Sequence, residues 1–313
     1  MLPIHFAPLQ GYTEDVYRRA HHHLCGGVAR YYTPFMRVEH GEVRRKDVFD
    51  MLPQHNEGLP LALQFIASDV REFETLLATA EAHWAAPLHI DLNMGCPFPL
   101  QVRHGRGAGL MADVARVEQI CAFMAAHTAH TYSVKMRLGV ERADEWRDVM
   151  PVLAAAPLTH ITLHPRVAAQ QYGGTPDMEA FSDFLAASPH PVVYNGDIAT
   201  ADDIRRLEER YPQLAGVMVG RGMLARPTLA REYTQGADCS DADVIAALRS
   251  LHDAVYENYS RRIPGEAQLL SKVRTFWDYA EPLLGRKAWK KIHKAGSMKN
   301  YLAAIESACR EIC

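Results

Sequence analysis

Short apolar runs recur along the first three quarters of the chain, and each gives way to a polar or glycine-containing turn. Runs of this length are typical of β-strands. We expect eight strands, at 4–8, 28–34, 61–66, 88–93, 132–137, 160–164, 191–195 and 216–220. Between most of them the apolar positions have helical spacing, as in 70–84, 113–127, 144–155, 200–210 and 224–234.

Strands that alternate with helices pair in parallel through βαβ units, and eight such units predict a closed (β/α)8 TIM barrel. A doubly wound sheet is the alternative, but it would need a GxGxxG turn after the first strand, which the sequence lacks. After Asp238 the pattern changes, because 241–262, 267–280 and 286–312 have helical spacing with no strand between them. We therefore expect a barrel domain, 1–238, and a small all-helical domain, 239–313.

Composition narrows the class of protein. The formal net charge is −3 and 48% of the 313 residues are hydrophobic, which is enough for a large core. The sequence has neither a membrane-spanning apolar run nor a secretory signal. Its six cysteines form no CxxC pair, which fits a reduced cytoplasmic protein without zinc or iron–sulfur sites. We expect a monomer with no metal, and we interpret the triplet His21-His22-His23 as a surface feature.

The C-terminal part is locally basic. From Lys272 to Lys299 the sequence has eight Lys or Arg residues against only Asp278 and Glu281. A run of this kind is usually a solvated helix face, but it also suits a polyanionic partner.

Polar side chains stand at the carboxyl ends of most predicted strands, which in a barrel meet at one mouth. Each has an ordinary explanation, such as an ion pair for Lys135 or a core position for His164. Their convergence favours a binding site. The set comprises Gln10, Gln64, Asn93 with Cys96, Lys135 with Arg137, His164, Asn195 with Asp197, and Arg221.

The turns after the last two strands, YNGDI and VGRG, suit a phosphate, because glycine amides approach it closely and Arg221 can bind it bidentately. Across the mouth, Lys135 and Gln64 suit the polar edge of a flavin, where charge gathers on reduction. These residues predict a phosphate-bearing cofactor, for which FMN is suitable.

Seven motifs, in this order and spacing, resemble the bacterial tRNA-dihydrouridine synthases: APLQGYTE, LALQF, DLNMGCP, GAGLM, VKMRLG, VVYNGDI and VMVGRG. The resemblance extends over essentially the whole chain and is closest to the C-type members, which act on position 16 of the D-loop. It implies an FMN-binding barrel, a helical RNA-recognition domain, and reduction of the C5–C6 double bond of tRNA uridines with electrons from NADPH or NADH.

The resemblance also implies residue roles. The proton donor would be Cys96. The FMN contacts would be Pro8, Leu9, Gln10, Gln64, Lys135, His164, Asn195, Gly196, Asp197, Gly220 and Arg221. The tRNA contacts of the C-type members would fall on Arg37, Arg137 and Tyr172 near the mouth. Apart from the resemblance, we expect Asn93 to hydrogen-bond the uracil edge, and Lys272 and Arg274 on the basic tail to contact phosphates.

The proposed chemistry explains the thiol in IDLNMGCP, residues 90–97. A hydride added to uracil C6 leaves an enolate that needs a proton at C5, and a thiol of pKa about 8.5 is mostly protonated at neutral pH. The ordinary alternative for Cys96 is a small packing residue. Two other functions stay open: an FMN barrel acting on a free pyrimidine, similar to dihydroorotate dehydrogenase, and a non-catalytic RNA-binding protein.

Overall fold

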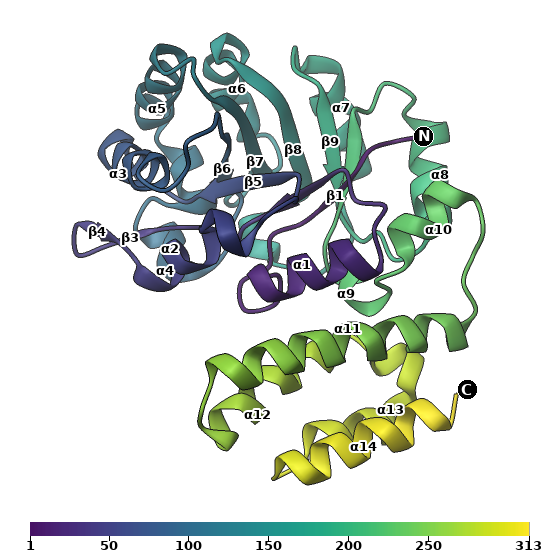
Figure 1. The fold of residues 1–313 in the computed structure, drawn as a ribbon. Coiled ribbons are helices and arrows are strands. Elements are labelled where there is room, and N and C mark those ends of the chain that lie inside the picture. The colour runs from purple at the N-terminus through teal and green to yellow at the C-terminus, as the bar shows by residue number, and fades with distance from the viewer. Residues whose placement is uncertain (313) are drawn as a thin grey trace.

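Eight parallel strands close into a barrel in the order β1-β10-β9-β8-β7-β6-β5-β2, so the first strand pairs with the last (Figure 1). The computed structural model describes residues 1–312. The strands are β1 (Ile4–Phe6), β2 (Arg30–Tyr32), β5 (Leu61–Phe65), β6 (His89–Met94), β7 (Thr131–Gly139), β8 (Leu158–Val167), β9 (Val192–Asn195) and β10 (Gly216–Val219). The predicted TIM barrel is therefore confirmed.

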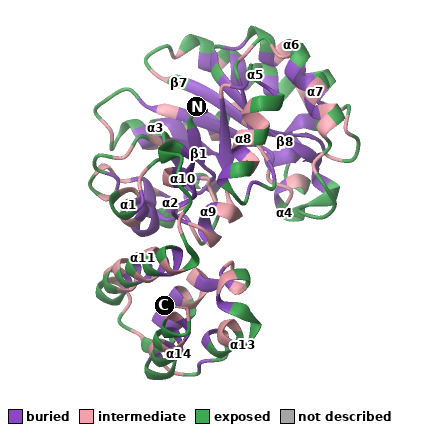
Figure 2. Cartoon of the chain, turned by 90° about the vertical axis from the view of Figure 1, so that its right-hand side faces the viewer, coloured by how far each residue is buried: buried purple, intermediate pink, exposed green. Residues whose placement is uncertain are grey.

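Helices cover the outside of the barrel, and their apolar faces pack on the strands (Figure 2). Several begin at a polar N-cap, such as Asp69, whose carboxylate accepts a hydrogen bond from the Glu72 amide at 3.0 Å. The helices are α1 (Asp15–Leu24), α2 (Arg45–Met51), α3 (Val70–Glu81), α4 (Pro99–Arg103), α5 (Val114–Ala126), α6 (Trp146–Ala155), α7 (Met178–Ala187), α8 (Ala201–Arg210), α9 (Arg221–Ala225) and α10 (Leu229–Gln235). A small hairpin, β3 (Val38–Glu39) and β4 (Glu42–Val43), precedes α2.

Two predicted helices are each interrupted. The segment 224–234 divides into α9 and α10, because Pro227 disfavours helical backbone at Arg226. The segment 286–312 divides into α13 (Glu281–His293) and α14 (Met298–Arg310), and Ser297 caps α14 by accepting a hydrogen bond from the Asn300 amide. The other C-terminal helices are α11 (Asp241–Arg262) and α12 (Glu266–Arg274), the latter followed by a 3-10 turn, Thr275–Trp277.

The C-terminal helices pack against the start of the barrel domain, where α11 runs alongside α1 (Figure 1). Tyr259 of α11 donates a hydrogen bond to Glu14 at 2.6 Å. Arg262, at the end of the same helix, forms a 2.8 Å ion pair with Asp15. Within residues 1–312, no helix is both long and apolar enough to cross a membrane.

The interpretation of the histidine triplet is wrong for His21. Its side chain is fully buried, and its ring hydrogen-bonds to the Tyr31 hydroxyl at 2.8 Å and to the Pro227 carbonyl at 3.0 Å. Burial lowers the pKa of His21 to about 3. It therefore ties α1 to β2 and to the turn before α10. No group of three or more His, Cys, Asp or Glu side chains in the described residues could hold a metal ion.

Candidate active site

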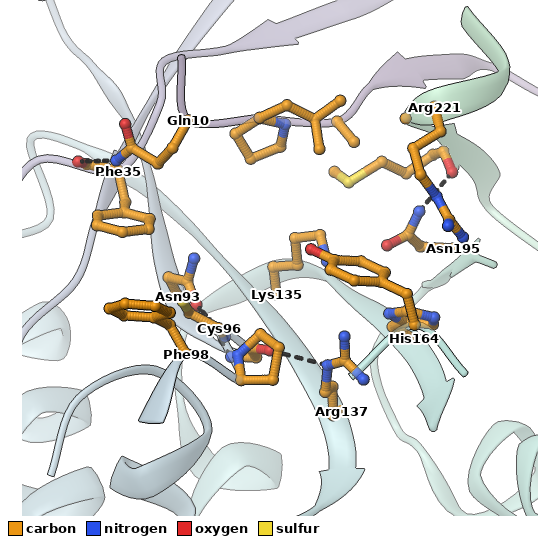
Figure 3. Close-up of a pocket in the computed structure, with 18 of the residues that line it drawn as sticks. Gln10, Phe35, Asn93, Cys96, Phe98, Lys135, Arg137, His164, Asn195 and Arg221 are labelled. Atoms are coloured by element: carbon orange, nitrogen blue, oxygen red, sulfur yellow. Dashed lines mark hydrogen bonds between the residues drawn. The ribbon is translucent and has the colours of Figure 1, made fainter. Parts of the chain in front are cut away.

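A cavity of about 480 Å³ opens at the carboxyl ends of the barrel strands (Figure 3). This volume lies in the range of small-molecule and cofactor sites, roughly 300–1,000 Å³. All the site residues predicted from the sequence line it, except Gln64, Lys272 and Arg274. The strand-end residues therefore do converge on one mouth.

The turn that carries Cys96 is held by hydrogen bonds from two sides. Asn93, at the end of β6, accepts hydrogen bonds through Oδ1 from the amides of Gly95, at 3.0 Å, and Cys96, at 2.9 Å. Arg137 on the neighbouring strand β7 donates a hydrogen bond to the Gly95 carbonyl at 2.9 Å. Asn93 therefore anchors the turn, and its predicted contact with a uracil edge stays a prediction.

The GAGLM segment, residues 107–111, packs directly against Cys96. The Ala108 amide donates a hydrogen bond to the Cys96 carbonyl at 3.1 Å. Gly107 has a φ of 59°, and a Cβ there would lie 2.8 Å from Cβ of Cys96. Only glycine suits this position, because both the backbone conformation and the close approach exclude a side chain.

The Cys96 thiol lies at the edge of the cavity. It is a free thiol, partly buried, and its burial raises its pKa above the ordinary value. A thiol with a raised pKa stays protonated at neutral pH and is poorly suited to act as a nucleophile. The environment of Cys96 therefore suits a proton donor.

Lys135 lies opposite Asn93 in the pairing of β6 with β7, near the centre of the cavity in Figure 3. Burial lowers its pKa to about 8, and the neighbouring Arg137 contributes to this shift. No carboxylate in residues 1–312 forms an ion pair with it. A half-buried ammonium with no carboxylate of the described residues within ion-pair distance suits a site for an anionic ligand.

The turns after β9 and β10 form the opposite wall. Asn195 donates a hydrogen bond to the Met218 carbonyl at 2.7 Å, which joins the two strand ends. Asp197 has a φ of 42°, an uncommon conformation for a residue with a side chain. A Cβ on Gly222 would collide with the Ile198 carbonyl, so the second turn packs directly on the first.

Arg166 lies behind the cavity wall, where it holds two residues that line the cavity, and this role was not predicted from the sequence. Its side chain is 1% exposed and donates hydrogen bonds to both carboxylate oxygens of Asp197, at 3.0 and 2.5 Å. It also donates to Nε2 of His164 at 3.1 Å, which makes that nitrogen an acceptor and leaves the ring proton on Nδ1. Burial, together with Lys135, Arg137 and Arg166, lowers the pKa of His164 to about 2. His164 is therefore neutral. The only sequence signal for Arg166 is its position two residues after His164 on the same strand, β8.

Aromatic side chains border the cavity. Tyr172 is 52% exposed, and the guanidinium groups of Arg221 and Arg137 lie 4.9 and 5.5 Å from the centre of its ring. Phe98, two residues after Cys96, is 59% exposed and was not predicted as a site residue. Exposed aromatic side chains of this kind suit stacking on nucleobases.

Three predicted site residues lie outside the cavity. Gln64 is fully buried and hydrogen-bonds to Asp91 and Asn93. Lys272 forms an ion pair with Glu14, and Arg274 donates a hydrogen bond to the His293 carbonyl. Their contacts with FMN and tRNA stay predictions.

A family model described as Dihydrouridine synthase (Dus) matches residues 5–311. The chain belongs to the dihydrouridine synthase family. Family membership confirms the resemblance carried by the seven motifs and, with it, the expectation of an enzyme. A tRNA-dihydrouridine(16) synthase of Pseudomonas syringae pv. tomato is 30% identical over 284 residues, 88% of this chain and 82% of that protein. A tRNA-dihydrouridine(16) synthase of Cupriavidus necator is 30% identical over 238 residues, 72% of each.

Solved structures support the barrel. Histamine dehydrogenase from Rhizobium sp. 4-9 is 12% identical with a TM-score of 0.53, over 80% of this chain and 48% of that one. Morphinone reductase, solved in complex with tetrahydroNAD, is 9% identical with a TM-score of 0.51, over 76% of this chain and 87% of that one. At these identities the likeness shows the fold alone.

Proposed function

We propose that the chain binds FMN in the cavity, takes electrons from NADPH, and reduces the C5–C6 double bond of uridine in tRNA. The observation that carries this proposal is that the Cys96 thiol, on the turn after β6, and the Lys135 ammonium, on the neighbouring strand β7, line one cavity. One group suits proton delivery and the other suits an anionic cofactor. Membership of the dihydrouridine synthase family supports the same chemistry.

The cavity residues fit FMN. Gly196 and Gly220 line the cavity beside Arg221, whose guanidinium forms an ion pair with Asp197 at 3.1 Å. This side suits the phosphate, because amides and a guanidinium bind it with charge-assisted hydrogen bonds. Lys135 would then lie against the isoalloxazine edge that gains negative charge on reduction. Bound and reduced, FMN would supply the hydride for uracil C6.

Cys96 would complete the reaction by giving its proton to C5. Its turn is fixed by Asn93 and Arg137, so the thiol is presented from a rigid position. Its raised pKa keeps the proton available, and solvent at the cavity mouth can replace it after each turnover. The target uridine must be flipped out of the tRNA to reach this depth.

The tRNA would be held by residues 239–313, which we propose as the recognition domain. Five basic residues on and just after α13 are exposed: Arg286, Lys287, Lys290, Lys291 and Lys294. None of them forms an ion pair with a carboxylate in residues 1–312. Because Lys272 and Arg274 already have partners in the protein, the α13 side chains are better placed to neutralise phosphates. Two relatives are named for position 16, and we propose the same uridine here.

The purified protein tests the proposal directly. It should retain a yellow flavin, oxidise NADPH, and form dihydrouridine in unmodified tRNA, with sequencing placing the product at position 16. The same position should lack dihydrouridine in a strain from which the gene is deleted. A colourless protein that binds tRNA would favour the non-catalytic alternative. Reduction of a free pyrimidine in place of tRNA would favour the dihydroorotate-dehydrogenase-like alternative.

A further inference from the structure

A row of polar side chains crosses three neighbouring barrel strands at one level. Gln64 of β5 pairs in register with Asp91 of β6, which pairs with Ser133 of β7. All three side chains are fully buried. The interior of such a barrel is ordinarily filled with branched apolar residues, and a buried carboxylate is costly. The row therefore calls for an explanation beyond packing.

Hydrogen bonds connect this row to the turn that carries Cys96. Ser133 donates to Oδ1 of Asp91 at 2.6 Å, and Gln64 donates through Nε2 to Oδ2 of Asp91 at 2.7 Å. Asn93 donates through Nδ2 to Oε1 of Gln64 at 2.9 Å. Oδ1 of Asn93 is then the atom that accepts from the amides of Gly95 and Cys96.

The direction of each hydrogen bond follows from the carboxylate. The Asp91 oxygens accept from Ser133 and from Gln64, so Gln64 turns its NH2 group toward Asp91 and its oxygen toward Asn93. Asn93 must then turn its own NH2 group toward Gln64 and its oxygen toward the turn. The backbone amides of Gly95 and Cys96 require the same orientation of Asn93, because an amide N–H can only donate to its oxygen. The two ends of the chain of hydrogen bonds therefore favour the same arrangement.

We propose that Asp91 is a positioning residue, which fixes the orientation of Gln64 and Asn93 and thereby holds the turn that presents Cys96. Asp91 neither lines the cavity nor hydrogen-bonds to Cys96, so its hydrogen bonds reach the turn through the two amide side chains. Its charge also raises the pKa of Lys135. The proposal deepens the function proposed above, because a fixed turn is what a proton donor at Cys96 requires.

We call the hydrogen-bonded chain Asp91–Gln64–Asn93 the relay. Hydrogen exchange at the Cys96 turn tests it in the absence of tRNA. Asp91→Leu removes the acceptor but keeps a similar volume, so Gln64 and Asn93 lose their imposed orientation. The Gly95 and Cys96 amides should then exchange about tenfold faster or more, while amides of β10 change little. Thr162→Val is the matched control, because it removes a buried hydroxyl of the same barrel that lies outside the relay. Wild-type exchange in Asp91→Leu would overturn the proposal.

A reversal of the relay provides a second test. Asn93→Asp alone places a carboxyl group at both ends of the Gln64 amide. One of the two carboxyl groups must then face the Gln64 oxygen, and that hydrogen bond is lost. Adding Asp91→Asn restores a complete set of hydrogen bonds with Gln64 turned around, because the new carboxylate at 93 still accepts from both turn amides. Protection should therefore fall in Asn93→Asp and return in the double variant.

The rescue must pass through Gln64, and repeating the pair in a Gln64→Leu background checks this. Persistence of the rescue there would indicate simple relief of repulsion between two carboxylates and would overturn the relay. Loss of the rescue supports it.

Steady-state kinetics test whether the relay affects catalysis, and the exchange experiment tests the relay independently of the proposed function. When the protein is saturated with FMN, Asp91→Leu should lower kcat for tRNA reduction about tenfold or more with KM for tRNA unchanged, and should lower the rate of NADPH oxidation without tRNA by much less. Since the exchange experiment uses no tRNA, its result stands even if the protein fails to reduce tRNA. A wild-type kcat in Asp91→Leu would overturn the positioning role.

Discussion

The ammonium of Lys272 lies 2.7 Å from Oε2 of Glu14, so one ion pair joins the C-terminal helices to the residue that precedes α1 of the barrel. Lys272 also donates a hydrogen bond to the Gly11 carbonyl at 3.0 Å. The Glu14 side chain is only 9% exposed and Lys272 only 21%, so the pair is less screened than a surface pair. Lys272 is thus a part of the joint between the barrel and the helical bundle.

Lys272→Ala should lower the free energy of unfolding by about 1.5–3 kcal/mol, the range for a hydrogen bond to a charged group. Burial alone would raise the pKa of Glu14, but Lys272, Lys46 and Tyr259 outweigh it and lower that pKa to about 2. The pairing therefore stabilises the fold fully above the ordinary carboxyl pKa and is lost as pH falls toward 2. Denaturant titrations at pH 7 and pH 3 should show a smaller difference between Lys272→Ala and wild type at the lower pH.

Because Lys272 forms this ion pair, Lys272→Ala could lower tRNA affinity either by weakening the fold or by removing a phosphate contact. A loss of tRNA affinity in proportion to the loss of stability would assign Lys272 to the joint. A loss of affinity at unchanged stability would instead restore the phosphate contact predicted from the sequence. Lys299→Ala, an exposed lysine at the start of α14, provides a control for the removal of one positive charge.

Replacing Lys290, Lys291 and Lys294 with Ala should weaken tRNA binding and make it less dependent on salt. Each lost phosphate contact should reduce the slope of log K against log salt concentration by about 0.7–0.9. These side chains are exposed, so the melting temperature should change little. Filter binding at several salt concentrations gives the slope, and an unchanged slope would exclude this face as the tRNA contact. NADPH oxidation without tRNA serves as the control reaction.

FMN affinity should fall as the pH rises through about 8. In the free protein burial lowers the pKa of Lys135 to about 8, so its ammonium is present below that pH and is lost above it. The hydrogen-bond acceptors of the flavin edge bind the charged ammonium better than the neutral amine, and affinity must therefore be greater on the acid side. Lys135→Arg keeps a charge at all these pH values and should remove the decline. Quenching of FMN fluorescence measures the affinity, and a decline that persists in Lys135→Arg would assign it to another group.

The barrel could be predicted because apolar periodicity reports local structure, and eight βα repeats leave few topologies. The mouth could be predicted because strand direction alone places Asn93, Lys135 and His164 at one end. The roles of Arg166 and Lys272 could not, since each depends on a carboxylate, Asp197 or Glu14, that is distant in the sequence. Periodicity shows which face of an element is buried, and it gives no partner for a charged group on that face.

The burial of Gln64 illustrates the same limit at shorter range. The sequence places it correctly at the end of β5, where it was expected to face the cofactor. The structure shows that both ends of its amide bind Asp91 and Asn93, because the pairing of three strands sets these side chains side by side. Strand register is a property of the assembled sheet, so such a row is invisible to a pattern read along one strand.

Cys96→Ala should retain FMN and accept electrons from NADPH, because neither step needs an acid over the pyrimidine. It should fail at the transfer to tRNA, since the C5 carbanion would find no positioned proton, and loss of a general acid costs about 10²–10⁴-fold. Cys96→Ser should be nearly as poor, because a hydroxyl is a far weaker acid than a thiol. If Cys96 were only a packing residue, both variants would lose a little stability and keep their turnover. Single-turnover oxidation of the reduced flavin by tRNA distinguishes these outcomes, and a wild-type rate in Cys96→Ala would remove the proton donor from the mechanism.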